Sequence, residues 1–227
     1  MERHFDQELA DLKMDILKMG SLVQSSIVLS MDALKQLSRD GARAVIDSDK
    51  AVDTLELKIV TQCVDLLAIR QPMAVDLRFI TMAMQMNTDL ERMGDLAVDI
   101  AQRVLELADK PLLKPLVDIP RLSVIACEMT RDVISAFLND DAESAKKVIL
   151  RDSEADTLRN SVQSELINDY MVKDCATIPR ALPLLLVARH LERICDHATN
   201  IAEDIIYMTQ ARMVKHHPEK LNNGQAQ

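Results

Sequence analysis

The sequence of 227 residues is poor in aromatic residues, glycine and proline. It contains no tryptophan, two tyrosines and three phenylalanines. Few aromatic rings are therefore available to bind partner proteins or to stack on nucleic acid bases. Four glycines and seven prolines leave little material for tight hairpin turns. Hydrophobic residues make up 48% of the chain, enough to bury a sizeable core. This composition predicts an all-α protein.

Basic residues are outnumbered by acidic ones, 27 to 36, which gives a net charge of −9. Such a chain repels phosphate backbones and anionic lipids, so we expect no nucleic acid partner, and a membrane association only through partner proteins. The N-terminus is charged, and the longest uncharged apolar run, Ala181 to Ala188, is too short to cross a bilayer. The sequence therefore predicts a cytoplasmic protein that is neither secreted nor transmembrane.

The four cysteines are isolated from one another. Cys63, Cys127, Cys175 and Cys195 form no Cys-x-x-Cys pair and have no histidine at zinc-finger spacing. We interpret them as reduced, buried thiols of a cytoplasmic protein.

The spacing of apolar residues is helical almost everywhere, and turn signals interrupt it at five places. Three prolines between Asp109 and Pro120 predict a linker, because proline lacks the amide donor that a helix interior needs. The predicted domains are a first three-helix bundle at 1–110, a linker at 111–120, a second bundle at 121–215 and a polar tail at 216–227. The predicted helices cover about 6–37, 42–69, 75–108, 121–138, 145–171 and 182–214.

Two pairs of similar segments reveal an internal duplication. LERMGDLAVDIA at 90–101 and LERICDHATNIA at 191–202 agree at seven of twelve positions, with a shift of 101 residues. DKAVDTL at 49–55 matches DSEADTL at 152–158 with a shift of 103. A nearly constant shift is the signature of a repeated unit. The sequence thus predicts two pseudo-symmetric, antiparallel three-helix bundles that lie side by side.

An apolar seam in the last helix of each half predicts the core. In the first half it comprises Met86, Leu90, Met93, Ala97, Ile100 and Val104. In the second half it comprises Leu184, Ala188, Leu191, Cys195, Ala198, Ala202 and Ile205.

Next to each seam runs a row of oxygen-bearing side chains four residues apart, hence on one helix face. The rows are Glu91, Asp95 and Asp99 in the first half, and Glu192, Asp196 and Asn200 in the second. Such a row could hold a hard or borderline cation such as Mg²⁺, Mn²⁺ or iron. Alternatively, it is a solvated helix flank whose charge is neutralised by Arg92, Arg103 and Arg193.

A second set of acids recurs with the repeat. Asp49 and Asp53 in the first half correspond to Asp152 and Asp156 in the second. They could complete a cation site from a neighbouring helix. The other explanation is that acids near a helix N-terminus are favoured by the helix dipole alone.

These repeated motifs, together with RQPMAVDLR at 70–78 and TIPRAL before the final helix, resemble the PhoU family over nearly the whole chain. The resemblance implies two pseudo-symmetric three-helix bundles and a metal cluster in each, held by a Glu/Asp-x-x-x-Asp motif at Glu91 and Asp95 and at Glu192 and Asp196. Asn200 departs from the acidic row, so the second site is expected to bind more weakly or with fewer ions. Iron, manganese, magnesium, zinc and nickel are not distinguished.

The resemblance also implies a regulatory role without enzymatic activity. Proteins of this family keep the phosphate-starvation response off by linking the phosphate ABC transporter, through its ATPase subunit PstB, to the sensor kinase PhoR, and they limit phosphate uptake. A metal ion could order the faces that the partners contact. We also expect a homodimer.

Two rival functions come from other classes. A di-iron oxidase or metallohydrolase places carboxylates on facing helices, but its Glu-x-x-His motif is absent, and we interpret His190 and His197 as surface or packing residues. A plain coiled-coil protein would tolerate alanine at Glu91 and Glu192. Nucleotide chemistry and a phosphate cradle are disfavoured because no glycine-rich loop precedes a Lys-Ser/Thr pair.

Overall fold

The computed structural model describes residues 2–212, and every regular element in this part of the chain is helical, which confirms the all-α class. The first half contains α1 (Glu2–Gln36), α2 (Arg39–Ser48), α3 (Lys50–Arg70) and α4 (Ala74–Leu107). The second half contains α5 (Asp118–Leu138), α6 (Ala142–Glu165), the π-helix η1 (Leu166–Met171), the 3₁₀-helix η2 (Cys175–Thr177) and α7 (Ile178–Gln210).

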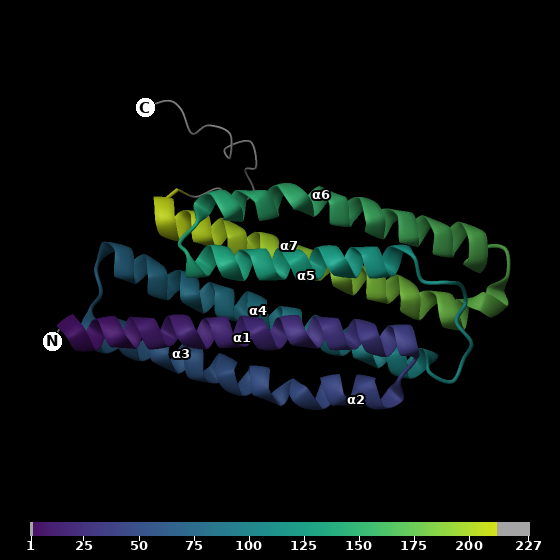
Figure 1. Cartoon of the computed structure of the whole chain (residues 1–227), viewed down its shortest axis with the longest axis horizontal. Helices are drawn as coiled ribbons and strands as arrows, with labels where there is room; N and C mark the ends of the chain where they lie inside the picture. Colours follow the sequence, from purple (N-terminus) through teal and green to yellow (C-terminus); the bar gives the residue numbers. More distant parts are fainter. Residues whose placement is uncertain (1, 213–227) are drawn as a thin grey trace, which may run out of the picture.

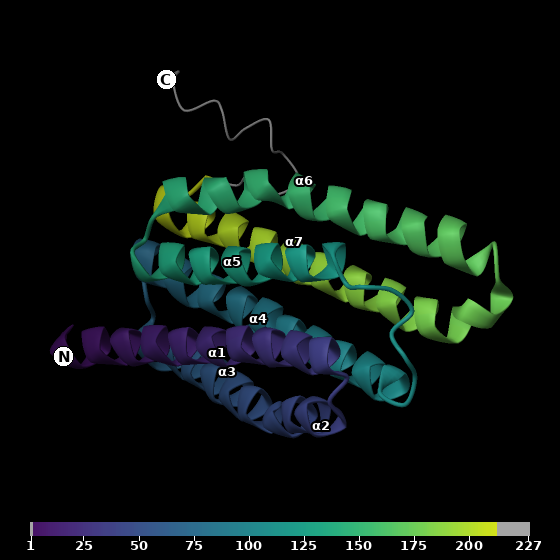
Figure 2. The same ribbon diagram turned by 45° about the vertical axis from the view of Figure 1, so that its right-hand side comes forward.

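The helices form two elongated three-helix bundles side by side (Figure 1), as the duplication predicts. Helices α4 and α7 make the most extensive contact in the molecule, and α1 packs on α5, so these four helices join the bundles. Helices α3 and α6 lie on the outer sides, an order that Figure 2 shows from a second direction. Each outer helix therefore packs on α4 or α7 of its own bundle.

The helix ends follow from local side-chain chemistry. The hydroxyl of Ser38 accepts a hydrogen bond of 3.0 Å from the amide of Gly41 and caps α2. Asp141 accepts hydrogen bonds from the amides of Glu143 and Ser144 and caps α6. At the end of α3, Gln71 adopts the left-handed conformation that commonly terminates a helix. The breaks predicted between residues 37 and 42, between 138 and 145 and between 69 and 75 are thus confirmed.

The prediction of one continuous helix over 42–69 is wrong, because the helix is interrupted between α2 and α3. Asp49 stands at the interruption, yet it keeps helical dihedral angles, with φ of −60° and ψ of −33°. Its carbonyl accepts hydrogen bonds from the amides of Val52 and Asp53, at 2.8 and 3.1 Å. The interruption is therefore a kink at Asp49 rather than a loop.

The last helix begins four residues earlier than the predicted 182, so Pro183 lies inside α7. Proline has no amide hydrogen, and the carbonyl of Pro179, one turn earlier, therefore loses its usual helical donor. The ammonium group of Lys110 donates to this carbonyl instead, at 3.2 Å. Lys110, just after the end of α4, thus supplies the hydrogen bond that the proline cannot make. Helix α5 also begins earlier than predicted, at Asp118.

Apolar side chains from both bundles form one continuous core. All residues of the two predicted seams in α4 and α7 are buried, which confirms the seams as core. Where the bundles meet, Phe79 of α4 stacks on Phe137 of α5, with ring centroids 5.9 Å apart. No helix within residues 2–212 has a stretch apolar enough to span a bilayer.

The cysteines are all free thiols, as predicted, but they are not all buried. Cys63 and Cys195 are fully buried, and Cys127 is half-buried. Cys175 is exposed because it lies in η2, at the end of the molecule where α6 returns to α7. The prediction of a buried thiol is wrong for this residue. The predicted tail at 216–227 and the predicted ends of the last helix and second bundle, at 214 and 215, lie outside the described residues.

Candidate functional site

In the first bundle, carboxylates of α3 and α4 gather into an acidic cluster formed by Asp49, Asp53, Glu56, Glu91 and Asp95. Burial raises the pKa of Glu91, and the negative charges of Asp95, Glu56 and Asp53 raise it further. Burial likewise raises the pKa of Asp49, with added repulsion from Asp53 and Asp95. Acids on neighbouring helices therefore lie close enough to disfavour each other's ionisation.

The second bundle repeats this arrangement with Asp152 and Asp156 of α6 and Glu192 and Asp196 of α7. Burial, followed by repulsion from Asp196, Asp156 and Glu192, raises the pKa of Asp152 to about 6. The pKa of Asp196 is raised by burial and then by Glu192 and Asp156. Eight of the ten predicted site residues thus fall into two clusters, four in each.

A small residue on α4 and another on α7 allow the outer helix of each bundle to pack closely against them. A Cβ atom on Gly94 of α4 would lie 3.5 Å from Oδ1 of Asp49, so this carboxylate sits directly against α4. Cys195 occupies the equivalent position of α7. Its thiol has a pKa raised by burial and, next, by the negative charge of Asp152. The duplicated acids therefore occupy equivalent places on the two helix pairs.

The helix dipole explains only one of the two acid pairs on the outer helices. Asp49 and Asp53 stand at the start of α3, where the dipole favours negative charge. Asp152 and Asp156, by contrast, lie well inside α6, which runs without interruption from Ala142 to Glu165. The dipole effect fades within the first turn, so it cannot account for the second pair.

Arginines are the counter-ions of the clusters. Arg92 lies 3.4 Å from Glu91 and 3.1 Å from Asp95. Arg159 of α6 lies 3.0 Å from Glu192 and 3.7 Å from Asp156. The sequence reasoning identified Arg92 but missed Arg159, because a residue on another helix is not visible in the spacing of α7. Arg103, also expected to neutralise the first row, pairs with Glu106 instead.

The donor set of both clusters suits a hard cation, because it consists of carboxylate oxygens from two adjacent helices. Within residues 2–212, no three or more histidine, cysteine or acidic side chains converge tightly enough to hold a metal ion as they stand. Asp95 is instead paired with Arg92, and Glu192 with Arg159. Cation binding would require these carboxylates to exchange arginine for metal.

The remaining two predicted residues, Asp99 and Asn200, lie at the contact between α4 and α7. Oδ2 of Asp99 lies 3.8 Å from Nδ1 of His190. The amide of Asn200 donates to Oδ1 of Asp89 at 3.3 Å, and Nδ1 of His197 lies 2.7 Å from the same oxygen. His190 and His197 are thus packing residues between the bundles, as predicted. The sequence reasoning did not identify Asp89.

Comparison with known proteins shows similarity in sequence and in structure. The model of the PhoU domain matches residues 16–104 and again residues 119–205, one match for each bundle. A phosphate-specific transport system accessory protein PhoU homolog of Aquifex aeolicus is 42% identical over 210 residues, which cover 92% of this chain and 95% of the relative. The homolog of Caulobacter vibrioides is 38% identical over 206 residues, covering 89% and 88%.

Two crystal structures share the fold. PhoU from Pseudomonas aeruginosa superposes with a TM-score of 0.89 at 33% identity, covering 92% of this chain and all of the other. The phosphate transport system regulatory protein PhoU from Streptococcus pneumoniae gives a TM-score of 0.86 at 30% identity, covering 92% and 99%. The likeness extends over both bundles and their contact.

Proposed function

Since this chain belongs to the PhoU family, we propose that it is a regulatory accessory protein of a bacterial phosphate transport system and not an enzyme. The observation that carries this proposal is the family match to both bundles. The names of its relatives support it, since they describe accessory and regulatory proteins.

The proposed role is negative regulation of the phosphate-starvation response. In this account the protein is a cytoplasmic adaptor between PstB and PhoR, and it limits phosphate uptake. The surface of the first bundle supports a binding role, because α3 exposes Leu57 and Val64, seven residues apart on one helix face, and Met73 follows the helix with 79% of its surface exposed. Exposed apolar side chains on a helix face are typical of a surface that binds a partner helix. The homodimer stays a prediction.

We further propose that metal ions bind the two acidic clusters. Asp49, Asp53, Glu91 and Asp95 would hold one site, and Asp152, Asp156, Glu192 and Asp196 the other. Burial raises the pKa values of Asp49, Glu91, Asp152 and Asp196, and repulsion between carboxylates raises them further. This supports the proposal, since a bound cation would relieve the repulsion. Each ion would cross-link an outer helix to α4 or α7 and so fix the face presented to a partner.

The weaker second site stays a prediction. That prediction rests on Asn200 standing where the first row has Asp99, yet both residues lie at the contact between the bundles. The clusters share four equivalent carboxylates and differ at one position, where the first has Glu56 and the second has Arg159. The di-iron alternative finds no support, because neither cluster includes a histidine and the relatives are described as accessory or regulatory proteins.

Binding measurements with the full chain test this function. Metal-loaded and chelator-treated protein would be titrated with PstB and with the cytoplasmic part of PhoR. We expect the metal-free protein to bind at least one partner about tenfold more weakly, within the range of ordinary allosteric coupling. The variant Glu91→Ala/Glu192→Ala should behave like metal-free protein, whereas Asp99→Ala, outside the clusters, should behave like the wild type. Equal binding by all four samples would contradict the metal-dependent account, and no binding to either partner would contradict the adaptor role.

A further inference from the structure

A cavity of about 630 Å³ lies between α6 and α7, next to the second acidic cluster. Three arginines line it, Arg159 from α6 and Arg189 and Arg193 from α7. Glu192 and Asp196 are its acidic wall residues, so the charged side chains of the wall sum to +1 in a protein whose net charge is −9. The cavity wall thus brings three guanidinium groups together on an acidic molecule.

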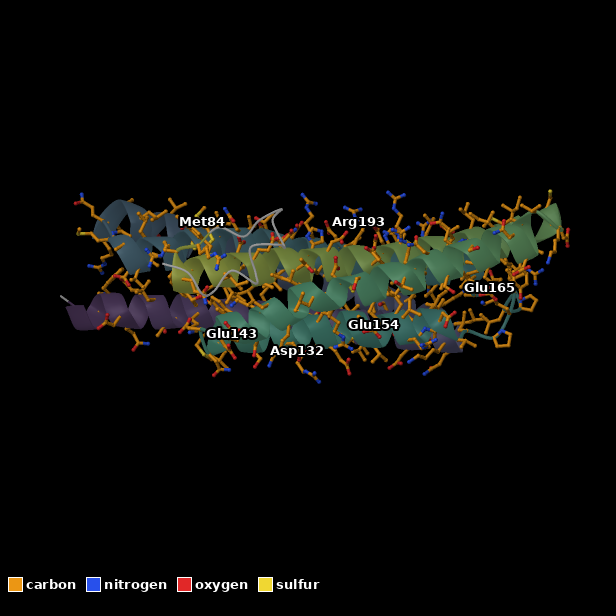
Figure 3. The ribbon with its side chains drawn as sticks, turned by 90° about the horizontal axis from the view of Figure 1, so that it is seen from above. Met84, Asp132, Glu143, Glu154, Glu165 and Arg193 are labelled. Carbon is orange, nitrogen blue, oxygen red and sulfur yellow. The ribbon has the colours of Figure 1, made fainter. Side chains whose placement is uncertain are left out.

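Two of these arginines form no close ion pair, although the charge of Arg193 partly offsets the effect of burial, which raises the pKa of Asp196. Arg189 and Arg193 are exposed residues, and neither forms an ion pair with any residue in the described part of the chain. In Figure 3, Arg193 of α7 projects from the same face as Met84 of α4, whereas Asp132 projects from the opposite face. The guanidinium groups of Arg189 and Arg193 therefore remain available to a ligand.

Arg159 has spare donor capacity as well. Its Nη2 lies 3.0 Å from Glu192, and its Nη1 donates to Asn160. Its Nε is buried, and among the described residues it has no hydrogen-bond partner. A buried donor without a partner is costly, and a ligand in the cavity is one way to satisfy it.

The duplication provides an internal control. The shift of 103 residues places Glu56 at the position of Arg159, and the shift of 101 places Thr88 and Arg92 at the positions of Arg189 and Arg193. In the first bundle Glu56 adds to the repulsion on Glu91. Both bundles have the same arrangement of three helices, and the first forms it without arginines at two of these positions, so the fold itself does not require three arginines here.

The backbone also differs between the halves at this cavity. Helix α6 passes into the π-helix η1, and Ile167 of η1 lines the cavity. The equivalent helix α3 stays α-helical from Lys50 to Arg70. Single π-helical turns are rare and occur frequently at functional sites. The second bundle thus departs from its repeat in both charge and backbone at the same place.

We propose that this cavity binds a phosphate group through Arg159, Arg189 and Arg193. Arginine is suited to this ligand because its planar fork of donors matches phosphate oxygens in a bidentate manner. No aromatic residue lines the cavity to stack on a nucleobase, so recognition centres on the phosphate group. The source is either free inorganic phosphate or the phosphate groups of a larger molecule. This inference does not depend on the metal ions proposed above.

Calorimetric titration of the full chain tests the proposal. The protein is freed of metal with a chelating resin and titrated with inorganic phosphate and with ATP, with chloride at matched ionic strength as the reference. We expect binding to the wild type and a loss of about tenfold or more in Arg189→Gln/Arg193→Gln, since charge-assisted hydrogen bonds are removed. Arg189→Lys, which keeps the charge but loses the fork, should show a smaller loss. Arg92→Gln, at the equivalent of Arg193, is the matched control and should bind like the wild type.

Each outcome decides the proposal. Binding of inorganic phosphate identifies the free anion as the ligand, and binding of ATP alone identifies the phosphate groups of a larger molecule. The proposal is overturned if neither compound binds more than chloride does, or if Arg92→Gln loses as much affinity as the double variant. Because no metal is present, failure here leaves the metal sites and the regulatory role untouched, and their failure leaves this result standing.

Discussion

Nδ1 of His197 on α7 lies 2.7 Å from Oδ1 of Asp89 on α4, within the largest helix contact of the molecule. Asn200 donates to the same carboxylate oxygen. His197 directly follows Asp196 in the second acidic cluster, and Asp89 stands two residues before Glu91 in the first. This hydrogen bond is therefore a direct polar link between the helices that carry the two clusters.

Removal of this link should weaken the contact between the bundles. His197→Ala and Asp89→Ala should each destabilise the protein, and a double-mutant cycle should give a coupling of about 1.5 kcal/mol, the lower end of the range for a hydrogen bond to a charged group. Urea denaturation measures it. The pair His190 and Asp99 is the matched control, because its atoms lie 3.8 Å apart, beyond hydrogen-bond distance, and its coupling should be smaller. Equal couplings would contradict the interpretation.

Repulsion between the carboxylates of the second cluster should lower the free energy of unfolding of the metal-free protein. Asp152→Asn removes one of the facing charges, so we expect it to raise the free energy of unfolding at pH 7 by about 1 kcal/mol, allowing for partial solvent screening. Chemical denaturation of metal-free protein measures this. Glu154→Gln, an exposed change on the same helix, should have little effect. If Asp152→Asn instead lowers the free energy of unfolding, the Asp152 carboxylate is not repelled by its acidic neighbours.

The same repulsion predicts a pH dependence. The pKa of Asp152 rises from its ordinary value of 3.8 to about 6 in the folded protein. The Asp152 carboxyl therefore binds its proton more tightly in the folded state than in the unfolded state. This tighter binding contributes fully to stability below pH 4, and the contribution is lost as the pH rises through 6. Comparison of metal-free wild type with Asp152→Asn between pH 4 and pH 7 isolates this residue. A difference that stays constant over this range would contradict the assignment.

The cysteines should differ sharply in reactivity. Cys175 is exposed, whereas Cys63 is fully buried and burial raises its pKa to about 11. Because the thiolate is the reactive form, iodoacetamide at neutral pH should label Cys175 first and Cys63 only after unfolding. Mass spectrometry of labelled peptides follows both reactions. Cys175→Ser should abolish the fast reaction, and rapid labelling of Cys63 in the native protein would contradict its burial.

Helices, core and acidic pairs could be predicted because they depend on local spacing. Apolar residues three and four apart define the seam of α7 from Leu184 to Ile205, and every member is buried. The repeated Glu-x-x-x-Asp at Glu91 and Glu192 likewise fixes its residues on one helix face. Repetition of the pattern in both halves supplied the bundle architecture.

Features that depend on how helices pack could not be predicted from spacing. Asp99 follows Asp95 by one turn, yet it faces His190 on α7 because the crossing of α4 and α7 decides what each flank meets. The kink at Asp49 and the π-helix η1 leave no proline or glycine as a signal. The arginine cavity does have a sequence signal, the exchange of Glu56 for Arg159 between the repeats, but only the structure joins Arg159 to Arg189.

The duplicated acidic clusters are the proposed metal sites of this protein. Elemental analysis of untagged protein, purified without chelator, tests this proposal most directly, with wild type compared with Asp95→Ala/Asp196→Ala and with Asp99→Ala/Asn200→Ala. We expect stoichiometric metal in the wild type and in the second variant, which changes only residues at the contact between the bundles, and loss of metal from the first. Wild-type protein that stays metal-free after reconstitution, or full metal content in Asp95→Ala/Asp196→Ala, would contradict the proposal and leave the clusters as solvated helix flanks.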